Sequence, residues 1–120
     1  MARPLILGNG NMLVCMDKNA CIRDFYPYVG QENHVSSNYH RIGVWIEGNF
    51  SWIYEEGWKL SQRYKKESLV GETTAINEKL NIELTITEAV HYEKNIFLRN
   101  IKVKNKNKEP KKIKIFCSQH

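Results

Sequence analysis

Alternation of apolar and polar residues at every second position constrains this chain more than any other feature of its sequence. The clearest case is "LNIELTIT", residues 80–87, in which apolar residues occupy the even positions and polar residues the odd ones. Side chains of an extended strand point alternately to its two faces, so this segment reads as a strand with one buried face. No window longer than a few residues keeps a helical period. The sequence therefore predicts an all-β protein.

Ten strands are expected where apolar residues alternate or form a short run between turn signals. They cover residues 5–8, 12–16, 21–26, 41–46, 50–54, 58–64, 68–76, 80–90, 96–104 and 111–118. The segments between them, such as "DKNA", "EEG" and "NKNKEP", are rich in residues that tolerate turn geometry. Short strands joined in this way pair antiparallel, and we favour a β-sandwich over a barrel.

Composition places the chain among ordinary globular proteins. Its 120 residues suffice for one domain, and 42% hydrophobic with 26% charged residues excludes a disordered or fibrous protein. The apolar run Leu5–Leu7 ends at Gly8 and is too short for a secretory signal. We expect a cytoplasmic protein with no membrane partner.

The net charge of +5 is concentrated in one segment. Between Lys102 and Lys114 lie seven lysines and one acid, Glu109, so this segment carries +6 and the remaining residues sum to −1. Its lysines alternate with apolar residues, and no aromatic residue lies among them to stack on a base. We interpret it as the solvated face of a hairpin whose lysines protect a sheet edge, with a nucleic-acid site as the alternative. We expect no nucleic-acid partner.

Cysteine and histidine patterns indicate neither a metal nor another cofactor. The three cysteines, at positions 15, 21 and 117, form no CxxC pair, which favours reduced thiols. Glu32, His34 and His40 match no zinc or calcium motif. The "GNGN" segment at residues 8–11 precedes no helix and is therefore a turn, not a phosphate-binding loop.

The segment "GVWIEGNFSWIY", residues 43–54, is the richest in large aromatics. A turn at Gly48-Asn49 would set Trp45 directly opposite Trp52, with two further aromatics on the same face. Such a face suits a sugar ring, whose C–H groups stack on indole. Burial between two sheets is the alternative that we favour, because large aromatics dominate interiors and the other face of this hairpin is apolar too.

Carboxylates give no sign of a catalytic pair. Glycoside hydrolysis uses two carboxyl groups held several ångström apart. Asp24 and Glu32, in "RDFYPYVGQENHV" at residues 23–35, are the only acids set among aromatics, and loop carboxylates usually bond nearby backbone amides. We expect no catalytic residue in this chain.

Several segments together resemble a known family. They are "LILGNGNMLVCMDKNACIRDFYPYVGQENHV", "HRIGVWIEGNFSW", "LVGETTAINEKLNIELTITEAVH" and "NIFLRNIKVKN". In this order they resemble the start of bacterial and archaeal proteins of glycoside hydrolase family 15, the glucoamylase-like enzymes. The resemblance runs over essentially the whole chain.

This resemblance implies that residues 1–120 are an N-terminal fragment of a larger, galactose-mutarotase-like super-sandwich. In such enzymes an (α/α)6 barrel follows and carries the catalytic glutamates, so the catalytic barrel is absent from this chain. The implied substrates of the parent enzyme are α-linked glucose oligomers or trehalose. The polar loop is then expected to face the barrel or its substrate cleft, through Tyr28, Gln31, Glu32, Asn33 and His34.

Two further expectations concern partners. A stand-alone carbohydrate-binding sandwich, using Trp45 and Trp52 as a sugar platform, is the alternative function. The final stretch "KKIKIFCSQH" stops inside an alternating strand, which predicts an uncovered edge beside Ile113, Ile115 and Phe116. We expect that edge to self-associate or to leave one sheet visibly incomplete.

Overall fold

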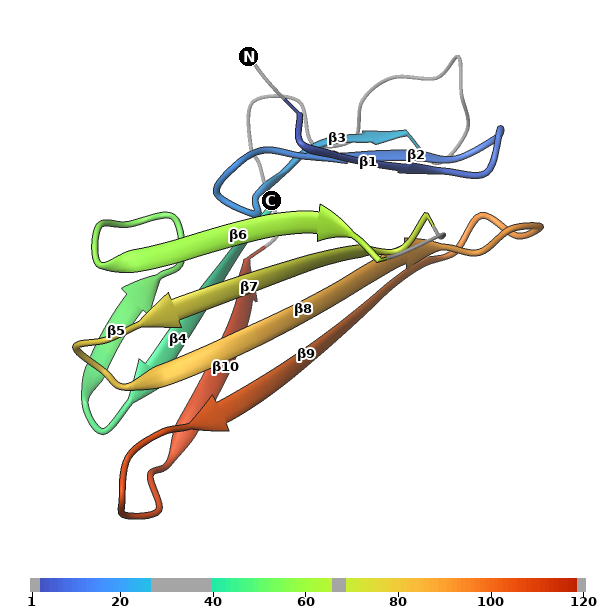
Figure 1. The fold of residues 1–120 in the computed structure, drawn as a ribbon. Coiled ribbons are helices and arrows are strands. Elements are labelled where there is room, and N and C mark those ends of the chain that lie inside the picture. The colour runs from blue at the N-terminus through green and yellow to red at the C-terminus, as the bar shows by residue number, and fades with distance from the viewer. Residues whose placement is uncertain (1–2, 27–39, 66–68, 119–120) are drawn as a thin grey trace.

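The computed structural model describes residues 3–26, 40–65 and 69–118, which form strands joined by turns (Figure 1). The strands are β1 (Leu5–Gly8), β2 (Leu13–Met16), β3 (Ile22–Tyr26), β4 (Arg41–Ile46), β5 (Asn49–Trp52), β6 (Trp58–Tyr64), β7 (Gly71–Asn77), β8 (Ile82–Val90), β9 (Phe97–Asn105) and β10 (Ile113–Ser118). All ten predicted strands are present, with ends that differ from prediction by at most three residues. Within the described ranges no helix is long and apolar enough to cross a membrane.

The strands form three antiparallel sheets, in the orders β1-β2-β3, β10-β4-β5 and β6-β7-β8-β9. The four-stranded sheet is one layer of the molecule, and the two three-stranded sheets lie over different parts of it (Figure 1). A single bridge between Ile22 and His40 joins β3 to the residue before β4, and so connects the two smaller sheets. The predicted all-β antiparallel sandwich is confirmed.

Two hydrophobic clusters fill the space between the layers. The larger one joins the inner faces of β4 and β8 and consists of Ala20, Ile42, Val44, Ile46, Ile53, Trp58, Ala75, Ile82, Leu84 and Ile86. The smaller one lies under the β1-β2-β3 sheet and consists of Leu5, Leu7, Met12, Val14, Met16 and Ile22, with Phe25, Val90 and Phe97 packed against it. The even-numbered apolar residues of the predicted strand 80–90 supply the centre of the larger cluster, as its alternation requires.

A buried ion pair lies between these clusters. Glu88 follows Ile86 of the larger cluster and precedes Val90 of the smaller one on the same face of β8. Its carboxylate accepts a 2.7 Å hydrogen bond from Nε of Arg99, the residue opposite it on β9. Glu88 is only 1% exposed, so this charge is almost entirely removed from water.

Asn9 links two distant turns. Its side-chain oxygen accepts hydrogen bonds from the backbone N–H groups of Asn11 and Met12, which closes the β1–β2 turn. Its amide nitrogen donates to the carbonyls of His91 (2.8 Å) and Lys94 (3.0 Å), in the β8–β9 turn. The "GNGN" segment is thus a turn, as predicted, and it also holds the first hairpin to the four-stranded sheet.

The predicted lysine hairpin is wrong in its pairing. Residues 97–105 pair with β8 in the four-stranded sheet, whereas 113–118 pair with β4 in the other layer. The connection crosses between the layers, and at this crossover the side-chain amide of Asn107 donates to the carbonyl of Leu80 (3.2 Å) in the β7–β8 turn. Lys102 and Lys104 are exposed on β9, an edge strand, in accord with their predicted role as edge guards.

Candidate functional site

The loop residues named from the sequence, Tyr28, Gln31, Glu32, Asn33 and His34, lie outside the described residues. The structure shows how the segment that contains them is held on both sides. β3 ends at Tyr26, and His40 exchanges two 3.0 Å backbone hydrogen bonds with Ile22 of the same strand. The ring of Phe25 lies 6.4 Å from that of His40, measured between centroids. Both flanks of the loop are thus fixed where the two smaller sheets meet.

The aromatic hairpin turns one residue earlier than predicted. Its two central residues are Glu47 and Gly48, with φ angles of 45° and 85°, so Trp45 lies opposite Phe50 and not opposite Trp52. Two-residue hairpins favour turns in which both central residues have positive φ, with glycine at the second position. Placing Gly48 second in the turn, instead of first, shifts the whole register.

The burial predicted for these aromatics is also wrong, because they face outward. Inward positions of the same sheet are filled by aliphatic residues, including Val44 and Ile53, which are fully buried. The other face carries what we call the outer aromatic cluster: Trp45, Phe50, Trp52, Tyr54 and Phe116. Phe50 and Phe116 are each 45% exposed. The cluster is therefore accessible surface and not inter-sheet core.

Within the outer aromatic cluster the rings contact one another mainly edge to face. Phe50 lies 4.9 Å from Trp52 and 5.6 Å from Phe116, between ring centroids. These contacts need Gly43, which lies between Trp52 and Phe116 in the sheet. A Cβ atom on Gly43 would approach the Phe50 ring to 2.6 Å and the Trp52 ring to 2.9 Å.

Changing Gly43 to Ala is expected to lift both rings off the sheet. Overpacking of this kind costs about 1–3 kcal/mol of stability. Displacement of the rings should also weaken the near-ultraviolet circular dichroism of the cluster. Urea unfolding of the variant measures the first effect. Gly48→Asn is the control, because nothing lies within 4 Å of that position and Asn tolerates its positive φ. Equal stability of wild type and Gly43→Ala would contradict the packing described.

Two cations lie on the indole rings of this surface. The guanidinium carbon of Arg41 is 4.8 Å from the Trp52 ring centroid, and its Nη1 donates to the Tyr54 hydroxyl at 3.3 Å. Nζ of Lys114 is 5.2 Å from the Trp45 ring centroid. The surface thus combines aromatic area with positive charge, which stabilises the cations by their attraction to the ring faces.

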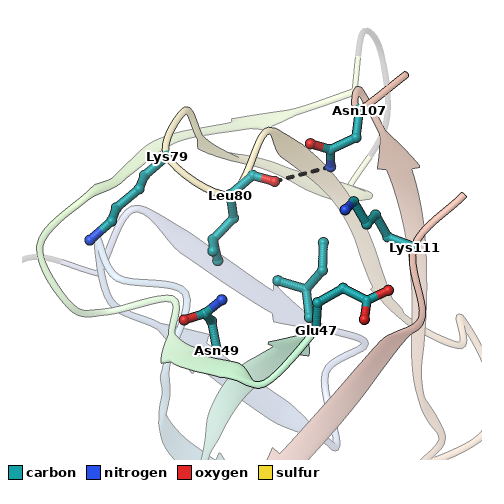
Figure 2. Close-up of a pocket in the computed structure, with 7 residues that line it drawn as sticks. Glu47, Asn49, Lys79, Leu80, Asn107 and Lys111 are labelled. Atoms are coloured by element: carbon teal, nitrogen blue, oxygen red, sulfur yellow. Dashed lines mark hydrogen bonds between the residues drawn. The ribbon is translucent and has the colours of Figure 1, made fainter. Parts of the chain in front are cut away.

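A small pocket opens at the end of the sandwich where three connections meet (Figure 2). It has a volume of 150 Å³ and is lined by Ile46, Glu47, Asn49, Lys79, Leu80, Asn107 and Lys111. A second pocket of 220 Å³ adjoins it through shared residues. Both are smaller than the roughly 300–1,000 Å³ of typical ligand sites. The Glu47 carboxylate accepts the backbone N–H of Lys112, so it fastens the crossover to the turn.

Two further described carboxylates, Asp24 and Glu55, also make structural contacts. Asp24 accepts a 2.8 Å hydrogen bond from Nε of Arg3, and the pair is partly buried. Glu55 accepts the backbone N–H of Trp52 and closes the turn after β5. Each of these two side chains therefore has a structural contact within the sandwich.

Two buried carboxylates, Glu88 and Asp17, were not predicted from the sequence. Burial raises the pKa of Glu88, and the nearby Arg99 opposes that shift without cancelling it. Asp17, also buried, receives a 2.6 Å hydrogen bond from Nε of Arg23 and accepts the backbone N–H groups of Asn19 and Cys21. A signal for Glu88 was present, because it occupies the inward register of β8 after three apolar residues. Burial of the Cys21 thiol, together with the nearby charge of Asp17, raises its pKa to about 12.

Comparison with known proteins gives one informative likeness. No family model matches the chain, and no solved structure matches it. Over 112 residues it is 29% identical to a protein of Methanocaldococcus jannaschii described as an uncharacterized glycosyl hydrolase. The alignment covers 92% of this chain and 17% of that protein, so the chain spans less than a fifth of its relative's length. The chain is therefore related in sequence to part of a glycosyl hydrolase.

Proposed function

We propose that this chain is the N-terminal, non-catalytic sandwich of a cytoplasmic, glucoamylase-like glycoside hydrolase. The parent enzyme acts on α-glucosides, either oligosaccharides or trehalose, and the sandwich packs against its catalytic (α/α)6 barrel. The likeness to a glycosyl hydrolase, extending over 92% of the chain but 17% of the relative, carries the proposal. The all-β fold is compatible with such a role.

The loop at residues 27–39 is the part of the sandwich that we assign to the barrel interface or substrate cleft. Its residues Tyr28, Gln31, Glu32, Asn33 and His34 offer the hydrogen-bonding groups that a sugar or a polar interface needs. Support comes from the fixed flanks of the loop at Ile22 and His40.

Reading the coding frame downstream of His120 tests the proposal most directly. A continuation into a segment with helical periodicity is expected, and the extended protein should hydrolyse maltooligosaccharides or trehalose. In that extended protein Gln31→Ala and Glu32→Ala should lower kcat/KM, whereas Tyr92→Ala, an exposed site on the β8–β9 turn, should not. An extended protein without any glycosidase activity would refute the assignment.

The 120-residue chain alone is expected to show no turnover of maltose, maltooligosaccharides or trehalose. Asp24, Glu47 and Glu88 are each engaged in a structural contact, and hydrolysis needs two carboxyl groups placed around the scissile bond. Release of glucose, measured over long incubations with purified protein, checks this. Activity that disappears in Glu32→Gln would show that the chain is itself an enzyme.

A carbohydrate-binding module is the second candidate, favoured by the outward position of Trp45 and Trp52. Stacking of a sugar on Trp52 would have to displace Arg41 from the ring, at a distance of 4.8 Å. Titration with maltoheptaose distinguishes the two candidates. Saturable binding that is lost in Trp52→Ala but kept in Tyr92→Ala would favour the module, and absence of binding would leave the first proposal in place.

A further inference from the structure

The two adjoining pockets at the end of the sandwich form one continuous depression, which we call the end groove. Its larger part, the 220 Å³ pocket, lies between residues 49–51 of β5 and the chain around the β7–β8 turn. Its smaller part is the 150 Å³ pocket of Figure 2, and the two parts share Asn49, Lys79 and Leu80. In that view Asn49 and Lys79 lie on one side of the smaller pocket and Lys111 on the other.

Both walls of the end groove are held by hydrogen bonds. On the β5 side, the indole Nε1 of Trp58 donates to the Ser51 hydroxyl at 2.7 Å. On the opposite side, Oδ1 of Asn77 accepts the backbone N–H of Leu80 at 2.9 Å. The groove is therefore pre-formed, which lowers the cost of ordering side chains when a ligand binds.

Several polar groups of the end groove are not used by the protein itself. Asn77 is 5% exposed, and its Nδ2 makes no hydrogen bond within the described residues. A Cβ atom on Gly57 would stand 4.0 Å from that nitrogen, so the glycine leaves the approach to it open. In the same part of the chain, no hydrogen bond or ion pair engages the side chains of Asn49, Glu56 and Lys79. Because a nearly buried donor needs an acceptor, a ligand oxygen would be bound at Asn77.

The chemistry of these groups selects a neutral ligand that carries hydroxyl groups. In the larger pocket the charges of Lys79 and Glu56 cancel, so neither an anion nor a cation is favoured. The amides of Asn49 and Asn77 both donate and accept hydrogen bonds, as a hydroxyl group does. Phe50, which is 45% exposed, adds apolar surface for the C–H groups of a ring. A sugar ring combines both properties.

We propose that the end groove is a saccharide-binding site, which takes one sugar ring in its larger pocket and directs the next unit toward its smaller one. A single ring is smaller than the drug-sized ligands for which pockets of roughly 300–1,000 Å³ are typical. Neither Trp45 nor Trp52 lines the groove, so this site is distinct from a sugar platform on those two rings. The choice of an α-linked glucoside as its ligand rests on the proposed function.

The indole N–H signals of the three tryptophans, followed by heteronuclear NMR, test the site in the 120-residue chain. Maltose is expected to shift the Trp58 signal saturably, because that indole bonds to Ser51 in the wall of the groove. A roughly millimolar dissociation constant is expected from so few hydrogen bonds. The signals of Trp45 and Trp52 should move much less.

Two exposed residues that line both pockets allow the affinity to be lowered without touching the core. Asn49→Ala and Lys79→Ala should each weaken maltose binding by about threefold to tenfold, which corresponds to the loss of a hydrogen bond. Lys102→Ala is the matched control, since Lys102 is exposed on β9 and does not line the groove. Its affinity for maltose should equal that of the wild type, as should the affinity of Trp52→Ala.

The outcomes separate the site from its alternatives. A saturable shift of the Trp58 signal that weakens in both groove variants, but not in Lys102→Ala, supports the proposal. A shift of the Trp52 signal alone would place the sugar on the outer aromatic cluster and overturn it. No shift of the Trp58 signal at tens of millimolar maltose, or equal affinity in all four variants, overturns it as well. Hydrolysis by the extended protein does not depend on this groove, so such a failure would leave the proposed function standing.

Discussion

Replacing Arg99 with Met is expected to destabilise the protein by about 3–5 kcal/mol at neutral pH, because it strands a buried carboxylate without its countercharge. Glu88 is 1% exposed, and within the described residues it forms an ion pair with Arg99. Removing one partner of such a pair leaves a desolvated charge in the gap between the two hydrophobic clusters. Urea unfolding at pH 7 measures the loss.

The loss should depend on pH in a definite direction. Burial already raises the pKa of Glu88, and removal of the Arg99 charge, which lowers that pKa, raises it further. A carboxyl group with a raised folded pKa contributes its full stability below its unfolded pKa, about 4.3, and loses it as pH rises through the folded value. The deficit of Arg99→Met relative to wild type should therefore shrink toward acidic pH.

The matched control removes both charges together. The double variant Glu88→Leu, Arg99→Met should lie within about 1 kcal/mol of wild type or above it, since apolar replacements of a buried pair are often neutral or stabilising. A double variant as unstable as Arg99→Met alone would show that the cost comes from lost packing and not from the stranded charge.

The second large effect is expected from Leu84→Ala, which should cost about 2–5 kcal/mol by leaving a cavity in the larger cluster. Leu84 is fully buried on the inward face of β8. The neighbouring Thr85 points to the opposite face, where it lies across from Lys102. Thr85→Ala should change stability by no more than about 0.5 kcal/mol, as is usual for surface sites. Similar costs at the two positions would contradict the inward and outward faces assigned to this strand.

Leu84 and Thr85 show that the sequence determines which face of the strand each side chain occupies. Period-two alternation specifies which side chains enter a core, because a shift of one residue would invert every side chain of the strand. The faces of residues 80–90 follow from that rule, and the existence of all ten strands follows from alternation together with short apolar runs between turn signals. The ends of the strands were predicted less accurately, because the same glycine can occupy either central position of a turn. Gly48 occupies the second position and not the first.

Contacts between residues far apart in the sequence could not be predicted from local patterns. Sequential strands usually pair, so residues 96–104 and 111–118 read as one hairpin. The chain instead crosses between the layers, where Asn107 contacts Leu80, 27 residues earlier, and no local pattern in the sequence predicts such a contact. The outward position of Trp45 and Trp52 could not be predicted for a different reason. Both faces of their hairpin are apolar, and only the placement of the second sheet decides which one is buried.

The hydrogen bonds of Asn9 join two parts of the chain that are synthesised several seconds apart. Its two partners on the β8–β9 turn, His91 and Lys94, follow it by 82 and 85 residues. At a synthesis rate of about 5–20 residues per second, roughly 4–16 s separate the emergence of the first hairpin from that of its binding surface. During that interval Leu5 and Leu7, both buried in the finished fold, have no layer to cover them. The apolar N-terminal hairpin is therefore uncovered for several seconds during synthesis, which exposes it to aggregation and to chaperone binding on the ribosome.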